Sequence, residues 1–584
     1  MPTIIRKLRA ECSPEHKAAV ATAAGCSVFF LLVWTVPGTA NNVHWFAFNH
    51  PFVFVCLVGI VLGVVTSALQ GSYELRGIGT ARYIGAIYLL GFALWAVVYL
   101  LSPVFLDHAE PQIACVSAVF DRGGPLYHGI DSAARYSLLY GPITWLVPAF
   151  FFKLIGPSTF ATKLGGALAG LGAVGLTYLA LRRRGKWCRA GVWAGCFVAL
   201  LLMFRHKAFW PRPEPYLVLC SALALCALTT RSWALSATLC GLAIGVAVNL
   251  KIHGVFYIAP ALGVMLDRRR YAAVVLAGLL ALMVGYAPYL LPNVSLHNMI
   301  VWLRAASMQG LKKGELLHNV EWIAFLSIPL VSLIAYRTHF AVGRLKQMIG
   351  RNVFVLCTSV LSLLAVTIIA CKPGAGPHHF MPFLPYIVFA VASEHGTNAN
   401  GQPCSEGLWK KFTAVISLSF CLTVFVLSLC CVQKDVSAAL SARPRAVSIC
   451  ADLRTILRNY PGMKISMGLG SGNGYRYTYS RPLLVFQGQP YLLDFAALMD
   501  MRKAGLEIPD STLEELRSGA VNIWLIPKGE TPFVMPSWYE AEDYFGEEFR
   551  NVFERYYYVG AQSAFFDIWF YRAGGAHITR DPSK

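Results

Sequence analysis

The chain has 584 residues, of which 56% are hydrophobic and only 14% are charged. With a mean hydropathy of +0.54, this composition excludes a soluble or disordered protein and indicates a polytopic membrane protein. The formal net charge of +20 would suggest nucleic acid in a soluble chain. Here Lys and Arg stand mainly in short loops between apolar runs, so we expect membrane lipids as partners and no nucleic acid.

Apolar runs of about 20 residues, the length needed to cross a bilayer, predict about thirteen transmembrane helices. The first two would form an N-terminal hairpin over residues 1–80, and the first is too long for a signal-peptide core, so we expect it to stay uncleaved. A further apolar segment, 141–156, is expected to lie as an interfacial helix on the outer surface. The expected spans are 18–36, 51–69, 81–101, 160–181, 190–204, 214–230, 233–249, 254–266, 271–291, 320–336, 353–371, 379–394 and 411–431.

The basic loops give the orientation. In this arrangement the loops 182–186, 268–270 and 344–351 fall on one side together with the N-terminus, and that side is cytoplasmic by the positive-inside rule. The outer loop 102–157 and the C-terminal region would then face the periplasm of a bacterial inner membrane.

After about residue 433 the long apolar runs stop, and alternating strand and helix patterns predict a periplasmic α/β domain over 433–584. The glycine-rich segment 468–474 lacks the GxGxxG register, so we interpret it as a turn rather than a phosphate cradle. The expected strands are 463–467, 482–486, 521–526 and 565–571, and the expected helices are 446–459, 494–504, 511–518 and 541–551.

Two acids lie in the outer loop, just past the span 81–101. Asp107 and Glu110 share one face if this segment is helical, because they are three residues apart. A carboxylate at a partly dehydrated site near the membrane can act as a general base. The alternative is that both are solvated loop acids.

Three other outer turns are short, rich in Gly or Pro, and carry cations. Cations that converge at the membrane surface could bind a phosphate or a pyrophosphate, although each one alone could instead lie among lipid headgroups. The residues concerned are Arg212, Lys251, His253, Lys372, His378 and His379.

A divalent cation site is a further possibility. Carboxylates would suit Mg²⁺ or Mn²⁺, and a mixture of imidazole and carboxylate would suit Zn²⁺. No spacing in the sequence enforces such a site, so the metal stays open. The available ligands are His108, Glu110, His253, His378 and His379.

The order of these features resembles a known family. An outer acidic loop is followed by Tyr140-Gly141-Pro142, an interfacial helix and the segment STFATKLGGALAGLGAVGLTYLALRRRG. This order resembles the C-type (GT-C) membrane glycosyltransferases, especially the protein O-mannosyltransferase and aminoarabinose-transferase branch. The segments RPEP, LKIHG and KPGAGPHHFMPFLP resemble the turns of that branch, and the resemblance predicts a GT-C-like catalytic domain over residues 81–432.

The resemblance implies a polyprenyl-phosphate-linked sugar donor, a periplasmic acceptor and inverting transfer by a carboxylate base. By position, Glu110 matches the second acid of an Asp-Glu-Pro motif, and Glu214 matches the acid after Arg-Pro. Lys251 and Lys372 match cations that bind the donor phosphate.

The chain departs from the family pattern at Ala109, which stands where the family has Asp. Asp107 and Glu110 therefore remain rival bases, and we favour Asp107. Tyr140 and His108 are expected to position the acceptor or the loop.

The rival class is a transporter or flippase for a lipid-linked or anionic substrate. Such proteins often carry ionisable residues near mid-span and show internal repeats. Here the ionisable residues gather in the outer turns and no repeat is visible, which favours the enzyme.

Overall fold

The structure is a computed structural model that describes residues 48–56, 58, 78–136, 139–184, 187–338, 342–394, 408–536 and 543–572. The expected first span, 18–36, and most of the second, 51–69, lie outside the described residues.

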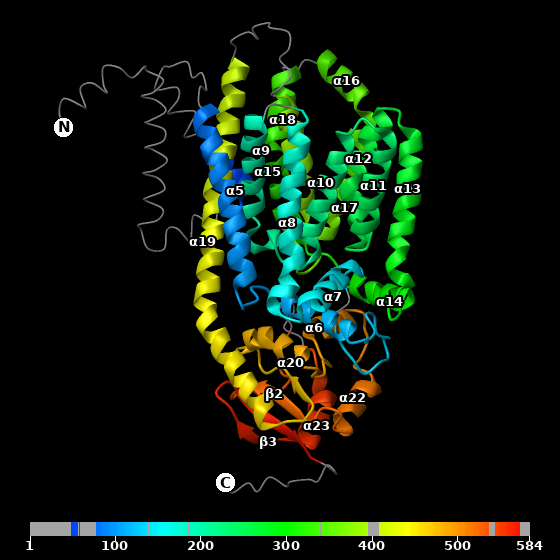
Figure 1. The fold of residues 1–584 in the computed structure, drawn as a ribbon, viewed down its shortest axis with the longest axis vertical. Coiled ribbons are helices and arrows are strands. Elements are labelled where there is room, and N and C mark those ends of the chain that lie inside the picture. The colour runs from blue at the N-terminus through cyan, green and yellow to red at the C-terminus, as the bar shows by residue number, and fades with distance from the viewer. Residues whose placement is uncertain are drawn as a thin grey trace, which may run out of the picture.

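A bundle of apolar helices forms one end of the molecule, and a small domain with a sheet forms the other (Figure 1). Six of the described helices are long and apolar enough to cross a membrane, and several others are shorter. The predicted polytopic helical class is confirmed, while the number thirteen stays a prediction. The bundle comprises α5 (Ile78–Leu101), α8 (Thr159–Arg182), α9 (Trp187–Leu202), α10 (Pro213–Leu228), α11 (Trp233–Val248), α12 (Val255–Asp267), α13 (Tyr271–Tyr286), α15 (Lys313–Thr338), α16 (Val342–Arg351), α17 (Val353–Ala370), α18 (Leu384–Glu394) and α19 (Leu408–Asn459).

Large apolar side chains are exposed on the outside of this bundle. Leu90 on α5, Leu282 on α13 and Leu361 on α17 are all more than half exposed. Such surfaces are stable against lipid tails, and each helix satisfies its own backbone hydrogen bonds, as a bilayer requires. Inside the bundle, small residues such as Gly241 and Gly245 let α11 pack closely on α13.

Three short helices lie between the bundle and the C-terminal domain. They are α6 (Ala109–Asp121), α7 (Ile143–Ile155) and α14 (Leu296–Ser307) (Figure 1). Helix α7 occupies the segment for which we predicted an interfacial helix. All three lie at the end of the bundle that carries the turns with Arg212, Lys251 and His378, so they are close to the candidate site.

Helix α19 runs without interruption from the bundle into the C-terminal domain. It passes through residue 433, where the composition changes, and it includes the helix that the sequence predicted at 446–459. One rigid element therefore joins the two parts of the chain.

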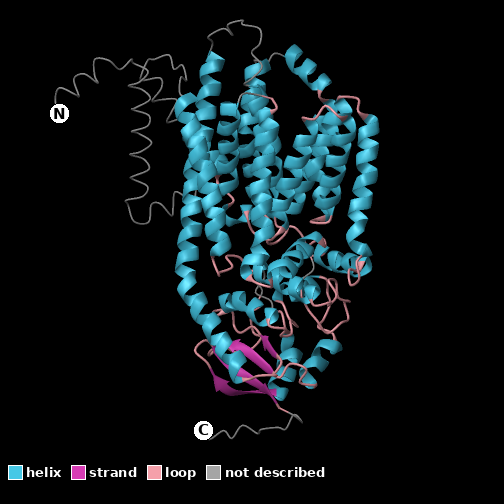
Figure 2. Cartoon of the chain, in the orientation of Figure 1, coloured by secondary structure: helices cyan, strands magenta, loops and turns pink. Residues whose placement is uncertain are grey.

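The C-terminal sheet has the strand order β1-β2-β4-β3 (Figure 2). Strand β1 (Ile465–Met467) pairs parallel with β2 (Ile523–Pro527). Strand β4 (Phe566–Tyr571) pairs antiparallel with both β2 and β3 (Tyr557–Gln562), and the register shifts between Val559 and Ala561. The helices of this domain are α20 (Pro482–Phe486), α21 (Phe495–Lys503), α22 (Asp510–Arg517) and α23 (Gly546–Tyr556).

The strand predicted over 482–486 is wrong, because these residues form the short helix α20. Pro482 occupies its first turn, where the fixed φ of proline suits a helix and the missing N–H costs nothing. Strand β3 was not predicted as a strand of its own. Its place at the sheet edge, with residues 558–560 exposed, explains the absence of a strong apolar pattern.

The glycine-rich turn 468–474 binds a carboxylate of the protein itself. The Gly472 N–H and the Ser471 hydroxyl each donate to Glu530 Oε2 at 3.1 Å, and the Gly474 N–H donates to Glu530 Oε1. A Cβ at Gly470 would lie 2.3 Å from the same carboxylate, so glycine is required there. The backbone donors are thus used internally, in keeping with the prediction of a turn.

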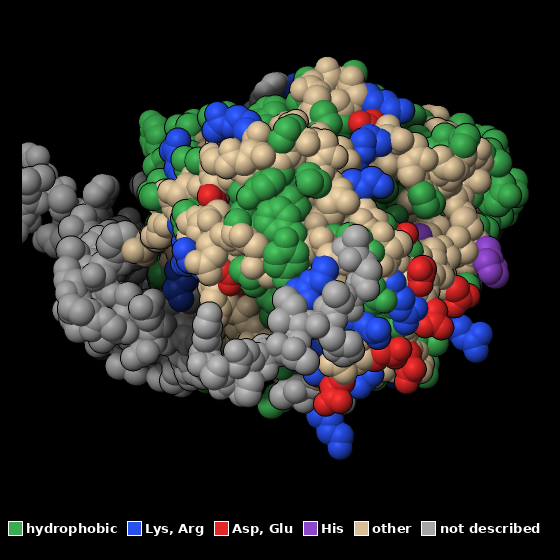
Figure 3. Space-filling view, turned by 90° about the horizontal axis from the view of Figure 1, so that it is seen from below, with side chains coloured by type: hydrophobic (Ala, Val, Ile, Leu, Met, Phe, Trp, Pro, Cys, Tyr) green, Lys and Arg blue, Asp and Glu red, His purple; other side chains and the backbone are tan. Residues whose placement is uncertain are grey.

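The far end of the C-terminal domain carries Lys, Arg, Asp and Glu side chains of both signs (Figure 3). This mixed surface contrasts with the apolar sides of the bundle and is typical of a surface in contact with water.

Candidate functional site

The Tyr-Gly-Pro turn packs directly on the turn that carries Lys251. The Gly141 N–H donates to the Leu250 carbonyl at 3.0 Å, and the Ile143 N–H donates to the Asn249 carbonyl at 3.1 Å. A Cβ at Gly141 would lie 2.1 Å from the Asn249 oxygen, so any other residue would push the two turns apart. This contact places Tyr140 beside Lys251.

Small residues on α8 let the turn that precedes Arg212 pack closely against this helix. A Cβ at Gly166 would lie 2.1 Å from the Trp210 carbonyl oxygen, and one at Gly170 would lie 2.4 Å from that of Ala208. Gly166 and Gly170 of the segment GGALAG therefore allow close packing between α8 and the turn 205–212.

Lys163 on α8 fixes the start of the outer loop. Its ammonium is fully buried and donates to the carbonyl oxygens of Tyr99 at 3.2 Å, Ser102 at 3.0 Å and Val104 at 2.6 Å. The Tyr99 carbonyl lies in the last turn of α5 and the other two follow the end of that helix, where a positive charge is favoured by the helix dipole. The clamp holds the chain just before Asp107, and the sequence analysis did not single out this lysine.

The side chain of Asp107 is 21% exposed. Its Oδ1 accepts from the Ala109 N–H at 3.0 Å and lies 3.7 Å from Arg212 Nη1. Burial alone would raise the pKa of this carboxyl, but His108, Arg212 and the Ala109 N–H outweigh it and lower the pKa to about 2. Asp107 is therefore ionised at physiological pH.

Glu110, one turn further along, is fully buried. Its Oε2 accepts from the Tyr99 hydroxyl at 2.9 Å, and its Oε1 lies 3.9 Å from His206 Nε2. Burial raises the pKa of this carboxyl against the lowering effects of Lys163 and His206. The two acids that sequence left as rivals thus have opposite surroundings.

His206 is held in turn by a carboxylate from α19. Asp435 Oδ2 accepts from the His206 backbone N–H and lies 3.2 Å from its Nδ1. Asp435 also accepts from Arg205 Nε at 2.6 Å. A line of side chains therefore runs from α19 through His206 to Glu110, and the sequence analysis missed both His206 and Asp435.

Arg212, Glu214 and Lys251 form one buried charged group at the N-terminal end of α10. Lys251 Nζ lies 2.7 Å from Glu214 Oε1, and Arg212 Nε lies 3.8 Å from Glu214 Oε2. The Arg212 guanidinium also packs on the rings of Trp210 at 4.2 Å and Tyr140 at 5.6 Å. Two positive charges converge here on one negative charge, so the group keeps a net positive charge.

Two histidines from the turn η4 (Pro377–Phe383) complete the wall of this group. Lys207 Nζ lies 3.4 Å from His378 Nδ1, and Lys251 Nζ lies 3.5 Å from His379 Nε2. Burial, reinforced by these lysines, lowers the pKa of both imidazoles well below its usual value, so they are neutral and accept from the ammonium groups. Lys207 also stands among the residues that sequence analysis missed.

His253 and Lys372 lie at the margin of the cluster. The His253 ring stacks on that of His379 with centroids 5.7 Å apart, and burial followed by the charge of Lys251 lowers its pKa to about 3. Lys372 follows the end of α17 and is half-buried, and its charge also lowers the pKa of His253.

Several buried polar atoms that face this cluster have no hydrogen-bond partner among the described residues. Buried polar atoms are normally paired with protein or water, so such a concentration marks a place where a polar ligand or water belongs. They are Glu110 Oε1, His206 Nε2, Arg212 Nε, Glu214 Oε2, His253 Nε2, His378 Nε2 and His379 Nδ1.

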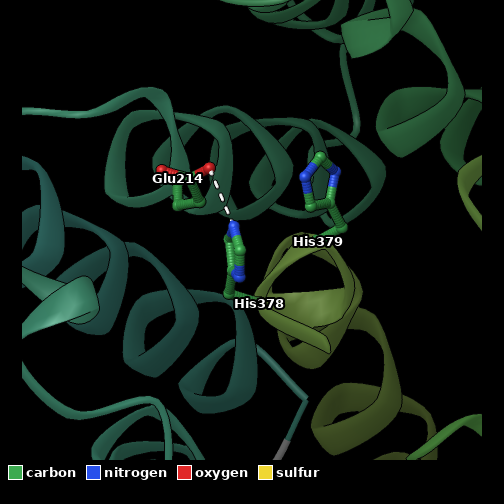
Figure 4. A group of neighbouring side chains, drawn as sticks. All are labelled: Glu214, His378 and His379. Carbon is green, nitrogen blue, oxygen red and sulfur yellow. Dashed lines mark ion pairs between the residues drawn. The ribbon is translucent and has the colours of Figure 1, made fainter. Parts of the chain in front are cut away.

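The cluster also contains side chains that could hold a metal ion. Glu214, His378 and His379 each offer a ligand atom within 4.8 Å of one another, and Figure 4 shows the carboxylate and the two imidazoles around a common space. This donor set suits Zn²⁺, but the Lys251 ammonium already contacts both Glu214 and His379. A metal ion there would have to displace the lysine, so the geometry favours Lys251 as the resident cation.

His108 lies apart from that metal-like group. Its ring meets that of Phe495 on α21 edge to face, with centroids 5.7 Å apart. The expected metal set of His108, Glu110 and the three other histidines is therefore not gathered as one group. His108 instead connects the Asp107 loop to the C-terminal domain, whereas Tyr140 contacts the cations through its ring.

Part of the chain matches a known protein family, and the fold is similar to that of solved structures. Residues 117–284 match the family model described as dolichyl-phosphate-mannose-protein mannosyltransferase. The structure is similar to ArnT from Cupriavidus metallidurans in the apo state, with 15% identity, 84% of this chain and 98% of that chain covered, and a TM-score of 0.52. The structure of the same protein bound to undecaprenyl phosphate is similar too, with 15% identity, 85% of this chain and 99% of that chain covered, and a TM-score of 0.51. No curated protein matches the chain.

The fold and the matched domain define the class: a multi-pass membrane protein with the fold of the C-type glycosyltransferases. The predicted resemblance is confirmed at this level, and the description of the matched family agrees with the predicted enzyme class. Within that class the chain is similar to ArnT along nearly its whole described length.

Proposed function

We propose that the protein transfers a sugar from a polyprenyl-phosphate donor to an acceptor on the periplasmic side of a bacterial inner membrane. One observation carries this proposal: an ionised carboxylate, Asp107, lies 3.7 Å from Arg212 at the edge of a buried cationic cluster with unpaired polar atoms. The ArnT structure with undecaprenyl phosphate supports this class of donor.

Arg212, Lys251 and Lys207 would bind the donor phosphate and stabilise it as it leaves. Charged donors held in a site from which water is largely excluded stabilise a developing negative charge better than the same groups in water. Lys372 and His253 would lie at the edge of this phosphate site. The charge of the cluster thus matches a lipid phosphate that becomes more negative when the sugar departs.

Asp107 would act as the base that takes the proton from the acceptor hydroxyl. With a pKa of about 2 it is a weak base as long as Arg212 and His108 stabilise its charge. A donor phosphate would draw Arg212 toward itself, weaken the Arg212–Asp107 interaction and so raise the basicity of the carboxylate. Attack from the face opposite the phosphate would invert the configuration of the sugar.

Glu110 and Glu214 have supporting roles in this mechanism. Glu110 is enclosed by Tyr99 and His206 and holds the loop, and Glu214 orients Lys251 and Arg212. Transporters often carry ionisable groups near mid-span, whereas the cluster of Arg212, Glu214 and Lys251 lies at one end of the bundle.

The test is an assay with purified protein and a set of polyprenyl-phosphate sugars. We expect at least one donor to be consumed with release of polyprenyl phosphate, and no consumption by Asp107→Asn. Equal consumption by the wild type and Asp107→Asn would contradict the proposal.

A further inference from the structure

A larger cavity, separate from the cationic cluster, opens between the helices beneath the bundle and the C-terminal domain. Its volume is about 430 Å³, which is in the range of small-molecule binding sites. It lies between the loop that follows α6, the start of α14 and the turn 488–491 of the C-terminal domain. Residues of its wall include Tyr127, His128, Tyr136, Asn298, Gln489 and Tyr491.

The walls of this cavity are fixed by hydrogen bonds from both parts of the chain. Arg135 pairs with the C-terminal domain through its N–H to Leu492 and its carbonyl to Asp494, both at 2.6 Å. On the opposite side, Asn298 Nδ2 donates to the Tyr127 carbonyl at 3.0 Å and Trp302 Nε1 donates to that of His128 at 2.9 Å. The cavity is therefore formed before any ligand binds.

The lining combines aromatic rings with neutral polar groups. Tyr136 and Tyr491 stack with centroids 5.4 Å apart and planes 16° apart, and Asn298 and Gln489 contribute amide groups. Arg122 is the one charged side chain among the described lining residues, and none of them is acidic. The tyrosine rings are almost fully buried and form a firm backing to the wall. Asn298 Nδ2 binds the Tyr127 carbonyl and Gln489 Oε1 accepts from the Ile465 N–H, so Asn298 Oδ1 and Gln489 Nε2 are the amide atoms that can accept from and donate to the hydroxyls of a sugar.

This cavity is connected to the Asp107 loop through a shared wall. Tyr491 also lines a narrower cavity with His108, Tyr475 and Phe495. This narrower cavity has room for about one water molecule. Because His108 directly follows Asp107, the Tyr491 ring stands between the larger cavity and the space beside the Asp107 loop.

We propose that the larger cavity binds a sugar ring of the acceptor, so that the acceptor is a glycan or a glycolipid. The assignment of the bound sugar to the acceptor rests on the proposed function, whereas sugar binding itself does not. The absence of acidic side chains from the described lining, with Arg122 at its edge, suits a neutral or an anionic saccharide.

Gly129 offers a way to fill the cavity without disturbing its wall. It lines the cavity, its φ is not left-handed, and a Cβ built on it meets no atom within 4 Å. Gly314, at the start of α15, is exposed and equally free of contacts, and it lies outside the cavity. The series Gly129→Ala, Gly129→Val and Gly129→Phe therefore has a matched control in Gly314→Phe.

The first test measures binding in detergent by saturation-transfer NMR. The probes are mannobiose, N,N′-diacetylchitobiose and glucose 6-phosphate, and a serine-rich hexapeptide serves for comparison. We expect at least one saccharide to bind the wild type and Gly314→Phe, and its signal to fall progressively along the Gly129 series, at least fivefold in Gly129→Phe. Thermal unfolding of each variant shows whether it is folded.

Three results would overturn the proposal. They are no saccharide signal with the wild type, a signal that persists in folded Gly129→Phe, and an equal loss in Gly314→Phe. Binding of the hexapeptide alone, abolished by Gly129→Phe, would assign the cavity to a protein acceptor and refute the saccharide.

The second test separates this inference from the proposed function. In a transfer assay, Gly129→Phe should raise KM for the acceptor at least tenfold and leave KM for the donor unchanged, because the cavity is separate from the cationic cluster. A raised donor KM with normal acceptor KM would refute an acceptor role. If saccharide binds but no donor is consumed, the proposed function fails while the binding site stands.

Discussion

Asp107 and Glu110 stand three residues apart, yet their carboxyl groups lie in opposite environments. Asp107 faces Arg212 and is partly exposed, and its pKa is lowered to about 2. Glu110 is fully enclosed against Tyr99 and His206, and burial raises its pKa. The first carboxylate is partly accessible to solvent, whereas the second lies within the packed structure.

Replacement of the two acids should therefore have different effects. Asp107→Asn is nearly isosteric and removes the base, so we expect kcat to fall about 10²–10⁴-fold with donor binding retained. Glu110→Gln should reduce kcat less and should lower Tm, because it disturbs a buried hydrogen-bonded group. Donor binding, kcat and Tm are measured for both variants; a normal kcat in Asp107→Asn with an inactive Glu110→Gln would exchange the two roles.

The pH dependence of donor use should report on Lys207. Burial lowers its pKa from 10.5 to about 8, against the raising effect of Asp107, so its charge is present below pH 8 and is lost above it. We expect kcat/KM for the donor to fall as the pH rises through about 8. Lys207→Arg should keep the positive charge and move the fall in kcat/KM to higher pH. Lys313→Arg, on the exposed surface, should leave the pH of this fall unchanged.

Unfolding cannot account for such a fall. Between pH 8 and 10.5 the unfolded chain binds the Lys207 proton more tightly than the folded one, so this group makes the folded state more stable as the pH rises. A pH profile that is identical in the wild type and Lys207→Arg would show that Lys207 does not contact the donor.

The orientation of the chain can be tested by labelling engineered cysteines in intact cells, with the native exposed cysteines replaced. A cysteine at exposed position 131 or 514 should react with an impermeant reagent, and one at exposed position 344 should not. Labelling at 344 alone would place the cationic cluster on the cytoplasmic side.

Hydropathy predicted most of the described helices because each span satisfies its own backbone and is apolar by necessity. It also predicted that Arg212, Lys251 and the histidines of 378–379 would share one side, and the structure brings them together. It could not show Asp435, whose partner His206 is 229 positions away. Lys163 was missed as well, since nothing in an apolar run reveals that a lysine there binds carbonyl groups of another helix.

Lys163 should be essential for the geometry of the loop rather than for donor binding. Lys163→Met leaves three carbonyl groups without their donor, and an unsatisfied buried polar group costs about 1–3 kcal/mol. We expect a lower Tm and a lower kcat with little change in KM for the donor. Lys153→Met, at an exposed position on α7, is the matched control, and equal effects in the two variants would refute this role.

The buried pair of Lys251 and Glu214 allows structural and functional effects to be separated. Lys251→Met leaves the Glu214 carboxylate buried without its partner at 2.7 Å, and loss of one member of a buried pair typically costs about 3–5 kcal/mol. We therefore expect a lower Tm together with a higher KM for the donor. The single variant alone cannot distinguish a lost phosphate contact from a distorted site.

The double variant Lys251→Met/Glu214→Gln resolves this ambiguity. Removal of both charges should restore much of the Tm, because no uncompensated charge stays buried. KM for the donor should nevertheless remain at least tenfold above that of the wild type, since the ammonium that would bind the phosphate is still missing. Recovery of both Tm and donor KM in the double variant would mean that Lys251 serves only to neutralise Glu214, and that the phosphate is bound by Arg212 and Lys207 instead.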